Sequence, residues 1–86
     1  MKNIKFCVPK DIEEKILHKH GIDLEELNNA LEYGNPRIFN QGQGIYIAIT
    51  HHIRYITIVF RQDKKLANVI TAYPSSDYHI RRYNKK

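Results

Sequence analysis

The spacing of apolar residues changes at Gly34-Asn35-Pro36, and this change constrains the fold of the 86-residue chain more than any other feature. Before this point, isoleucines and leucines recur every three or four residues, as they do on one face of a helix. After it, apolar and polar residues alternate, as they do in half-buried strands. A chain of this length forms one domain. The sequence therefore predicts a single α+β domain over residues 1–86.

The first part of the chain predicts a short strand and a helix. Ile4, Phe6 and Val8 alternate with polar residues and with Cys7, and Pro9 would end that strand. Over residues 10–20, apolar residues four apart give a one-sided helix, which Gly21 would cap.

The start of a second helix is well marked. Asp23 can accept a hydrogen bond from the first turn, and Glu26 stands three residues later, as in a capping box. Ile22 before the cap and Leu27 inside the helix are spaced as a hydrophobic staple. Gly34-Asn35-Pro36 would end the helix.

The second part of the chain predicts strands over residues 37–40, 45–50, 53–60 and 66–73. Polar turns over residues 41–44 and 62–65 and at His51-His52 separate them. A hydroxyl of Ser75 or Ser76 can cap a last short helix that runs through Tyr83.

These elements predict an antiparallel sheet of three to five strands with the two N-terminal helices on one face. The opposite face, with Tyr46, Tyr55, Thr57 and Arg61, would stay open. The predicted core consists of Ile12, Ile16, Leu27, Leu31, Ile47, Ile49, Ile56, Ile58 and Phe60.

Charge is unevenly distributed along the chain. Residues through Gly34 include five lysines and seven acidic residues, whereas from Asn35 onward there are nine lysines and arginines and only two acids. This asymmetry is typical of proteins that bind a polyanion or an acidic protein, although a basic surface can also serve solubility alone.

The cysteine content and the hydropathy pattern indicate a cytoplasmic protein. Cys7 is the single cysteine and cannot form an internal disulfide. No apolar run is long enough to span a bilayer, and the first residues do not have the pattern of a secretory signal. We therefore expect no membrane association.

Three kinds of site lack support in the sequence. The five histidines do not stand at metal-ligand spacing, and Cys7 has no partner. Ser75 and Ser76 lack the glycine pattern of a nucleophile elbow, and Gly42 and Gly44 fit a hairpin turn better than a phosphate loop. We therefore predict no metal and no cofactor.

The C-terminal run from Asp77 to Lys86 mixes arginines, lysines, tyrosines and a histidine. Arginine can grip phosphate with a bidentate fork, and tyrosine can stack on an unpaired base. The alternatives are a solvated basic tail and, for Tyr83, a role as an anchor that packs the last helix onto the sheet.

The order of several short motifs resembles that of BrnT-type toxins over nearly the whole chain. The residues that carry the resemblance are the segment Phe6 to Gly21, which ends Lys19-His20-Gly21, then Asn35-Pro36-Arg37, Arg54 before an aliphatic strand, Val69-Ile70-Thr71-Ala72, and Ser76, Arg81, Arg82 and Tyr83.

This resemblance implies a RelE-like fold and a ribonuclease that arrests translation. It also implies a neutralising antitoxin, a ribbon-helix-helix DNA-binding protein through which the pair would contact its operator DNA. The sequence departs from the family pattern at Tyr73 and Ile80, where arginine is usual, and at His79, where an acid is usual. A related domain family shares the Thr-Ala-Tyr-Pro ending at residues 71–74.

Metal-independent RNA cleavage needs a base for the 2′-hydroxyl, an acid for the leaving oxygen and cations beside the phosphate. Histidine titrates near neutral pH and suits both proton roles. We predict an endoribonuclease toxin; the alternative is a non-catalytic module that binds RNA or a protein through the same basic face. The predicted catalytic residues are His79, Arg82, Tyr83, His20 and Arg54, and the predicted RNA-binding residues are Lys19, Arg61, Arg81 and Tyr55.

Overall fold

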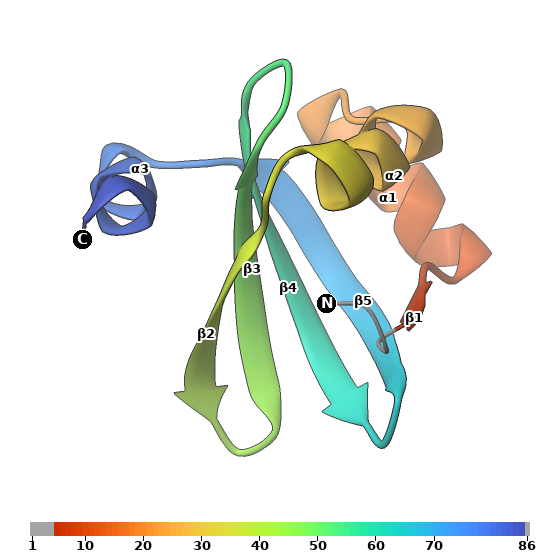
Figure 1. Cartoon of the computed structure of the whole chain (residues 1–86). Helices are drawn as coiled ribbons and strands as arrows, with labels where there is room; N and C mark the ends of the chain where they lie inside the picture. The colour runs from red at the N-terminus through yellow and green to blue at the C-terminus, as the bar shows by residue number, and fades with distance from the viewer. Residues whose placement is uncertain (1–4, 86) are drawn as a thin grey trace.

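The computed structural model describes residues 5–85 and contains three helices and a five-stranded sheet, as the sequence predicts. No helix in this part of the chain is both long enough and apolar enough to cross a membrane. Figure 1 shows the elements, which in chain order are β1 (Lys5–Cys7), α1 (Lys10–His20), α2 (Leu24–Tyr33), β2 (Arg37–Gly42), β3 (Ile45–His51), β4 (Tyr55–Asp63), β5 (Leu66–Pro74) and α3 (Asp77–Asn84).

The sheet has the order β1-β5-β4-β3-β2, and its last four strands form the predicted antiparallel meander. The expectation of a wholly antiparallel sheet is corrected at one edge, where β1 pairs with β5 in parallel. A parallel pair requires a long connection between its strands, and here both helices and three strands intervene. Phe6 of β1 packs edge-on against Phe60, with ring centroids 5.1 Å apart. Ile4, which the sequence places in this strand, lies outside the described residues.

The two N-terminal helices begin and end close to where the sequence places them. Gly21 follows α1 with a φ of 67°, a left-handed conformation that glycine adopts without strain. At the start of α2, the carboxylate of Asp23 accepts a 2.8 Å hydrogen bond from the Glu26 amide. The reciprocal half of the capping box does not form, because the Glu26 carboxylate binds Arg54 instead. Ile22 and Leu27 are both buried in the same core cluster.

The main core lies between the sheet and helices α1 and α2. Strand pairing places Tyr46 opposite Phe60 and Ala48 opposite Ile58, so these residues share the face that the helices cover. Tyr46 was expected on the open face, but its ring stacks on Phe60 with centroids 5.7 Å apart. Its position follows from the register, because alternate residues of a strand point to opposite faces.

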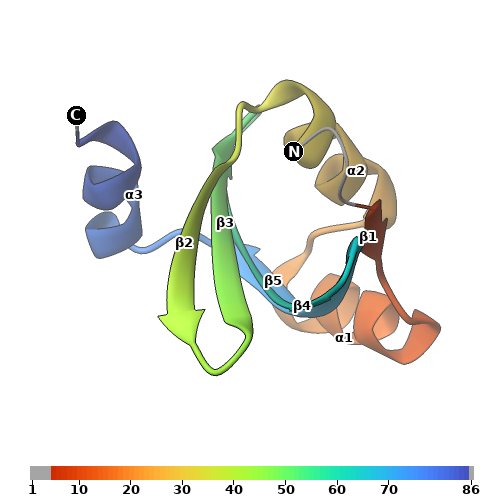
Figure 2. The ribbon, with the colours of Figure 1, turned by 60° about the horizontal axis from the view of Figure 1, so that its bottom comes forward.

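The other face of the sheet carries a second, smaller core. Ile47 and Ile49 are buried as predicted, but they alternate with Ala48 and therefore point away from α1 and α2. Helix α3 contacts β3 on that side. Figure 2 shows α3 beside β2 and β3, across the sheet from α1. The face expected to be open is therefore covered near Thr57, which is fully buried, and exposed near Arg61.

The turn after α2 depends on a glycine because of close backbone packing. A Cβ on Gly34 would overlap the hydroxyl of Thr50 and lie 2.5 Å from the carbonyl oxygen of Ala30. That hydroxyl donates a buried 2.6 Å hydrogen bond to the Ala30 carbonyl, and the His51 amide donates to the Gly34 carbonyl. The end of α2 is thereby joined directly to β3.

Candidate active site

Two side chains hold helix α3 against the sheet: Arg37, which extends from the sheet to the helix, and Tyr83, which extends from the helix to the chain before β2. Arg37 on β2 donates hydrogen bonds to the carbonyls of Tyr83 and Lys85, at 2.6 and 2.8 Å. A cation at this position also suits the negative end of the helix dipole. The Tyr83 hydroxyl in turn lies 3.0 Å from the carbonyl oxygen of Gly34 and 2.9 Å from that of Asn35. Tyr83, predicted as catalytic, thus anchors the helix in this structure.

His79 lies on the side of α3 that faces β4. Its Nδ1 is 3.1 Å from the hydroxyl of Thr57, which is itself 2.7 Å from the hydroxyl of Ser75. Because Thr57 is buried, this chain of contacts holds the imidazole in one orientation. Burial lowers the pKa of His79 from its ordinary value of 6.5, and the positive charge of Arg82 lowers that pKa further. His79 is therefore mainly uncharged at neutral pH.

A second histidine lies across a tyrosine from His79. Tyr73, at the end of β5, has its ring centroid 6.2 Å from that of His79 and 6.0 Å from that of His20. His20 and Lys19 belong to the last turn of α1. Two of the predicted proton-transfer residues thus flank Tyr73, a position at which the sequence departs from the BrnT pattern.

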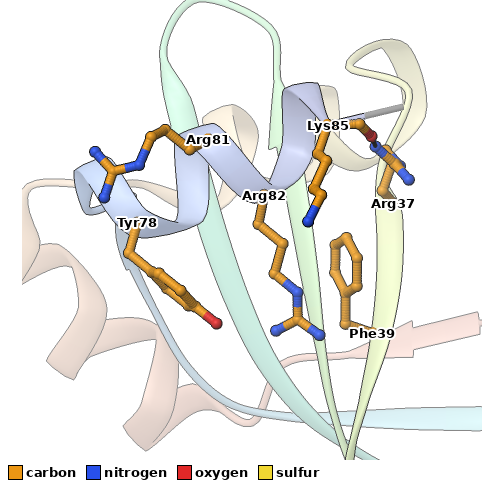
Figure 3. A pocket seen from close by; sticks show the side chains of 6 residues that line it. All are labelled: Arg37, Phe39, Tyr78, Arg81, Arg82 and Lys85. Atoms are coloured by element: carbon orange, nitrogen blue, oxygen red, sulfur yellow. Dashed lines mark hydrogen bonds between the residues drawn. The ribbon is translucent and has the colours of Figure 1, made fainter.

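A basic pocket opens between α3 and β2, with a volume of about 530 Å³. Arg82 lies over the ring of Phe39, with its guanidinium carbon 4.2 Å from the ring centroid, which is a cation–π distance. In Figure 3, Arg82 reaches down from the helix between Tyr78 and Phe39. The pocket is lined by Arg37, Phe39, Tyr78, Arg81, Arg82 and Lys85.

Tyr55, predicted to bind RNA, packs beside the C-terminal helix at the start of β4. Its ring meets that of Tyr83 edge-on at 5.7 Å and stacks on that of His51 at 4.0 Å. The side-chain amide of Asn84 donates a 3.3 Å hydrogen bond to its hydroxyl. Through these contacts, Tyr55 forms part of the surface on which α3 packs.

Two of the predicted arginines lie apart from this cluster. Arg54 forms an ion pair with Glu26, at 2.8 Å between Nε and Oε2, and donates to the Gly21 carbonyl at the α1–α2 junction. The bond to Glu26 raises the pKa of Arg54 further. Arg61 lies six residues along β4 from Tyr55, about 20 Å away, beside the β2–β3 turn. The fold thus gathers Arg81 and Arg82 with His79 and leaves Arg54 and Arg61 elsewhere.

No group of three or more histidine, cysteine or acidic side chains within residues 5–85 is arranged to hold a metal ion. Cys7 is exposed on β1. The side chains that gather at α3 are cationic, aromatic and imidazole groups, which suit phosphate binding and proton transfer.

Sequence reasoning did not assign several residues of this region to a site, namely Arg37, Phe39, Tyr73, Lys85, Thr57 as the partner of His79, and Tyr78 as part of a pocket. The alternation of Arg37 and Phe39 in a predicted strand places both on one face and was available as a signal. Tyr78 and Arg82 are four residues apart, which places them on one side of a helix.

Comparisons with known proteins give one informative result. Neither a scan against protein-family models nor a search of curated proteins finds a match. Among solved structures, the chain is similar to the Brucella abortus ribonuclease toxin BrnT, with a TM-score of 0.67 and 18% sequence identity. The alignment covers 86% of this chain and 99% of BrnT. The chain has a BrnT-like fold. The likeness covers most of both chains, and at this level of identity it concerns the fold.

Proposed function

We propose that this chain is the toxin of a type II toxin–antitoxin pair and that it cleaves RNA as a metal-independent endoribonuclease. The single observation that carries the proposal is the position of His79, a mainly uncharged imidazole held between a buried hydroxyl and a basic helix. The BrnT-like fold supports it, because a solved structure with that fold, BrnT of Brucella abortus, is that of a ribonuclease toxin. An uncharged imidazole can accept a proton at physiological pH.

The proposed reaction moves two protons around one phosphodiester. Nε2 of His79 accepts the proton of a ribose 2′-hydroxyl, and the 2′-oxygen bonds to phosphorus while the bond from phosphorus to the 5′-oxygen breaks. The leaving 5′-oxygen takes a proton from the Tyr73 hydroxyl, and the proton held by His79 then returns to the tyrosinate through solvent. The ring of His20, at the end of α1, lies 6.0 Å from that of Tyr73. The guanidinium carbon of Arg82 lies over the Phe39 ring, and its N–H groups would donate to the phosphate oxygens. Arg81 adds positive charge beside them.

Partners follow from the same proposal. A cognate antitoxin would cover the basic face of α3 and block access of RNA to His79. In the family that the sequence resembles, this partner is a ribbon-helix-helix protein, through which operator DNA would be bound. The adjacent reading frame is the place to look for it.

Cleavage can be tested directly with purified protein and 5′-labelled single-stranded RNA in the presence of EDTA. We expect fragments with 2′,3′-cyclic phosphate ends, and we expect RNA with a 2′-deoxy nucleotide at the cleaved position to resist. In cells, induced expression should arrest growth, and co-expression of the adjacent reading frame should restore it. Absence of cleavage of free RNA and of ribosome-bound messenger RNA would overturn the proposal.

A non-catalytic binding module is the second candidate, and a specific observation favours it. The Tyr83 hydroxyl, Arg54 and Tyr55, all predicted as functional, make hydrogen bonds that hold the fold together. A protein that binds RNA tightly, leaves it intact and does not arrest growth would match this second function.

A further inference from the structure

The pocket between β2 and α3 has two aromatic walls that the proposed proton transfers do not use. Its walls combine two aromatic rings, Phe39 and Tyr78, with the cations of Arg81, Arg82 and Lys85. Aromatic and guanidinium planes are the surfaces on which unpaired bases stack. Its volume of about 530 Å³ lies within the range of small-molecule sites.

We infer that this pocket binds one unpaired nucleotide of a single-stranded RNA, with the base between Tyr78 and Arg82 and the phosphates on Arg81 and Lys85. This inference rests on the proposed function and specifies how that site selects its substrate.

The arrangement of Arg82 supports a stacking role. The guanidinium carbon of Arg82 lies 4.2 Å from the centroid of Phe39, and Figure 3 shows Arg82 between Phe39 on one side and Tyr78 on the other. A base inserted between Arg82 and Tyr78 would contact both the guanidinium and the Tyr78 side chain, which line the same pocket. Tyr78 is 61% exposed, which is unusual for a tyrosine that the fold itself would need. Stacking on an aromatic ring is tolerant of base identity, so the pocket would hold any unpaired base.

The pocket also adjoins His79. The rings of Tyr78 and His79 are 5.6 Å apart, so a base stacked on Tyr78 places its own ribose and phosphate next to the imidazole. A base inside a duplex cannot enter, because its faces are already stacked on its neighbours. The geometry therefore predicts a preference for single strands over duplexes.

Charge alone does not account for this site. An acidic peptide would also be attracted to Arg81, Arg82 and Lys85, but its carboxylates would not pack against the aromatic rings of Phe39 and Tyr78. RNA therefore fits the pocket better than a carboxylate-rich segment does, and a competition experiment can separate the two ligands.

Binding can be measured without cleavage by using a fluorescent single-stranded oligonucleotide with 2′-O-methyl groups at every position. Tyr78→Ala should weaken binding roughly five- to a hundred-fold, the loss expected for one stacked base. Tyr33→Ala is the matched control, because Tyr33 is 63% exposed on α2, and it should bind as the wild type does. Replacement of a single base by an abasic site should weaken binding to the wild type and have much less effect on Tyr78→Ala.

The outcomes are distinct for the pocket and for the proposed ribonuclease. If Tyr78→Ala and Tyr33→Ala bind RNA with equal affinity, the inference that the pocket binds a nucleotide is refuted, even if the wild type cleaves RNA. Competition by an oligoglutamate peptide as strong as that by single-stranded RNA of equal charge would also overturn it. If the wild type binds RNA in a Tyr78-dependent way but cleaves none, nucleotide binding by the pocket is supported and the proposed ribonuclease activity is refuted.

Discussion

The two faces of the sheet differ in what covers them. On the side of α1 and α2, the buried residues are apolar, among them Leu27, Ile58 and Phe60. On the side of α3, the buried isoleucines share the face with Thr57, His79 and the anchoring hydroxyl of Tyr83. The first face depends on burial of apolar area, and the second is held largely by hydrogen bonds to a short helix.

This contrast indicates that the α3 face of the sheet is the one that can hold polar, reactive side chains. A polar group is costly to bury unless it is hydrogen-bonded, and α3 satisfies its own through Arg37 and the Gly34 carbonyl. The helix can therefore present His79 and a row of cations beside the sheet, while the main core on the other face supplies most of the stability. Substitutions on the α3 face should therefore mainly lower activity, and substitutions in the main core should mainly lower stability.

The largest separation is expected for His79→Ala. Loss of a general base typically lowers the rate 10²- to 10⁴-fold, or roughly 3–5 kcal/mol of barrier. Because the imidazole is partly exposed, the thermal midpoint should change little. The measurement is RNA cleavage by the variant beside wild type, with circular dichroism to verify folding. His18→Ala is a suitable control, since His18 is an exposed histidine in the last turn of α1. Activity of His79→Ala within a few-fold of wild type would eliminate the proton-transfer role.

The next effect compares two fully buried isoleucines on opposite faces. Ile58→Ala should cost roughly 2–5 kcal/mol in the free energy of unfolding, because it leaves a cavity in the larger core. Ile49→Ala should fall near the lower end of that range, because the short helix α3 can settle toward the gap. Urea denaturation of both variants measures the difference. A larger loss for Ile49→Ala would show that the α3 face contributes more to stability than the α1–α2 face.

The sequence predicted the elements well because their signals are local. The turn glycines, the caps at Asp23 and Ser76 and the change of period at Gly34 each act within a few residues of the chain. Periodicity also predicted the core residues, of which Ile12 and Leu31 are partly buried and the others are buried. Their assignment to faces was less certain, because Ile47 and Ile49 could be placed only once the register with β4 was known.

The candidate site was harder to predict because its residues come from distant parts of the chain. Arg37 and Tyr83 meet across 46 residues, and no local pattern indicates that this arginine caps that helix. Conversely, Arg54 and Arg61 have the right chemistry, but strand direction places Arg61 at the far end of the sheet and Glu26 holds Arg54 at the helix junction. His79 and Arg82 could be placed together from the sequence because they lie on a single short helix.

A smaller effect distinguishes the anchoring role of Tyr83 from a role in chemistry. Tyr83→Phe removes the hydroxyl that faces two carbonyl oxygens, so it should destabilise the protein by about 0.5–1.5 kcal/mol. Cleavage measured well below the unfolding temperature should stay within a few-fold of wild type. A rate loss of a hundred-fold or more in a folded Tyr83→Phe protein would restore Tyr83 to the catalytic group.

The smallest effect concerns the charge that α3 places beside His79. Arg82→Met removes a cation that lowers the pKa of His79, so that pKa should rise toward 6.5 while burial still keeps it below that value. Titration of the His79 ring by NMR measures the shift, and Arg61→Met, at the far end of β4, is the control.

The same substitution has a consequence for the pH dependence of stability. A histidine whose pKa is lowered by folding stabilises the protein above pH 6.5, and this stabilisation is lost as the pH falls through the folded-state value. Arg82→Met should reduce that acid loss, because the charged imidazole no longer meets a second cation. The acid limb of the cleavage rate should move to higher pH by the same amount as the pKa. An unchanged His79 pKa in Arg82→Met would mean that burial alone sets the charge state of the proposed base, and that the cations of α3 serve only to bind phosphate.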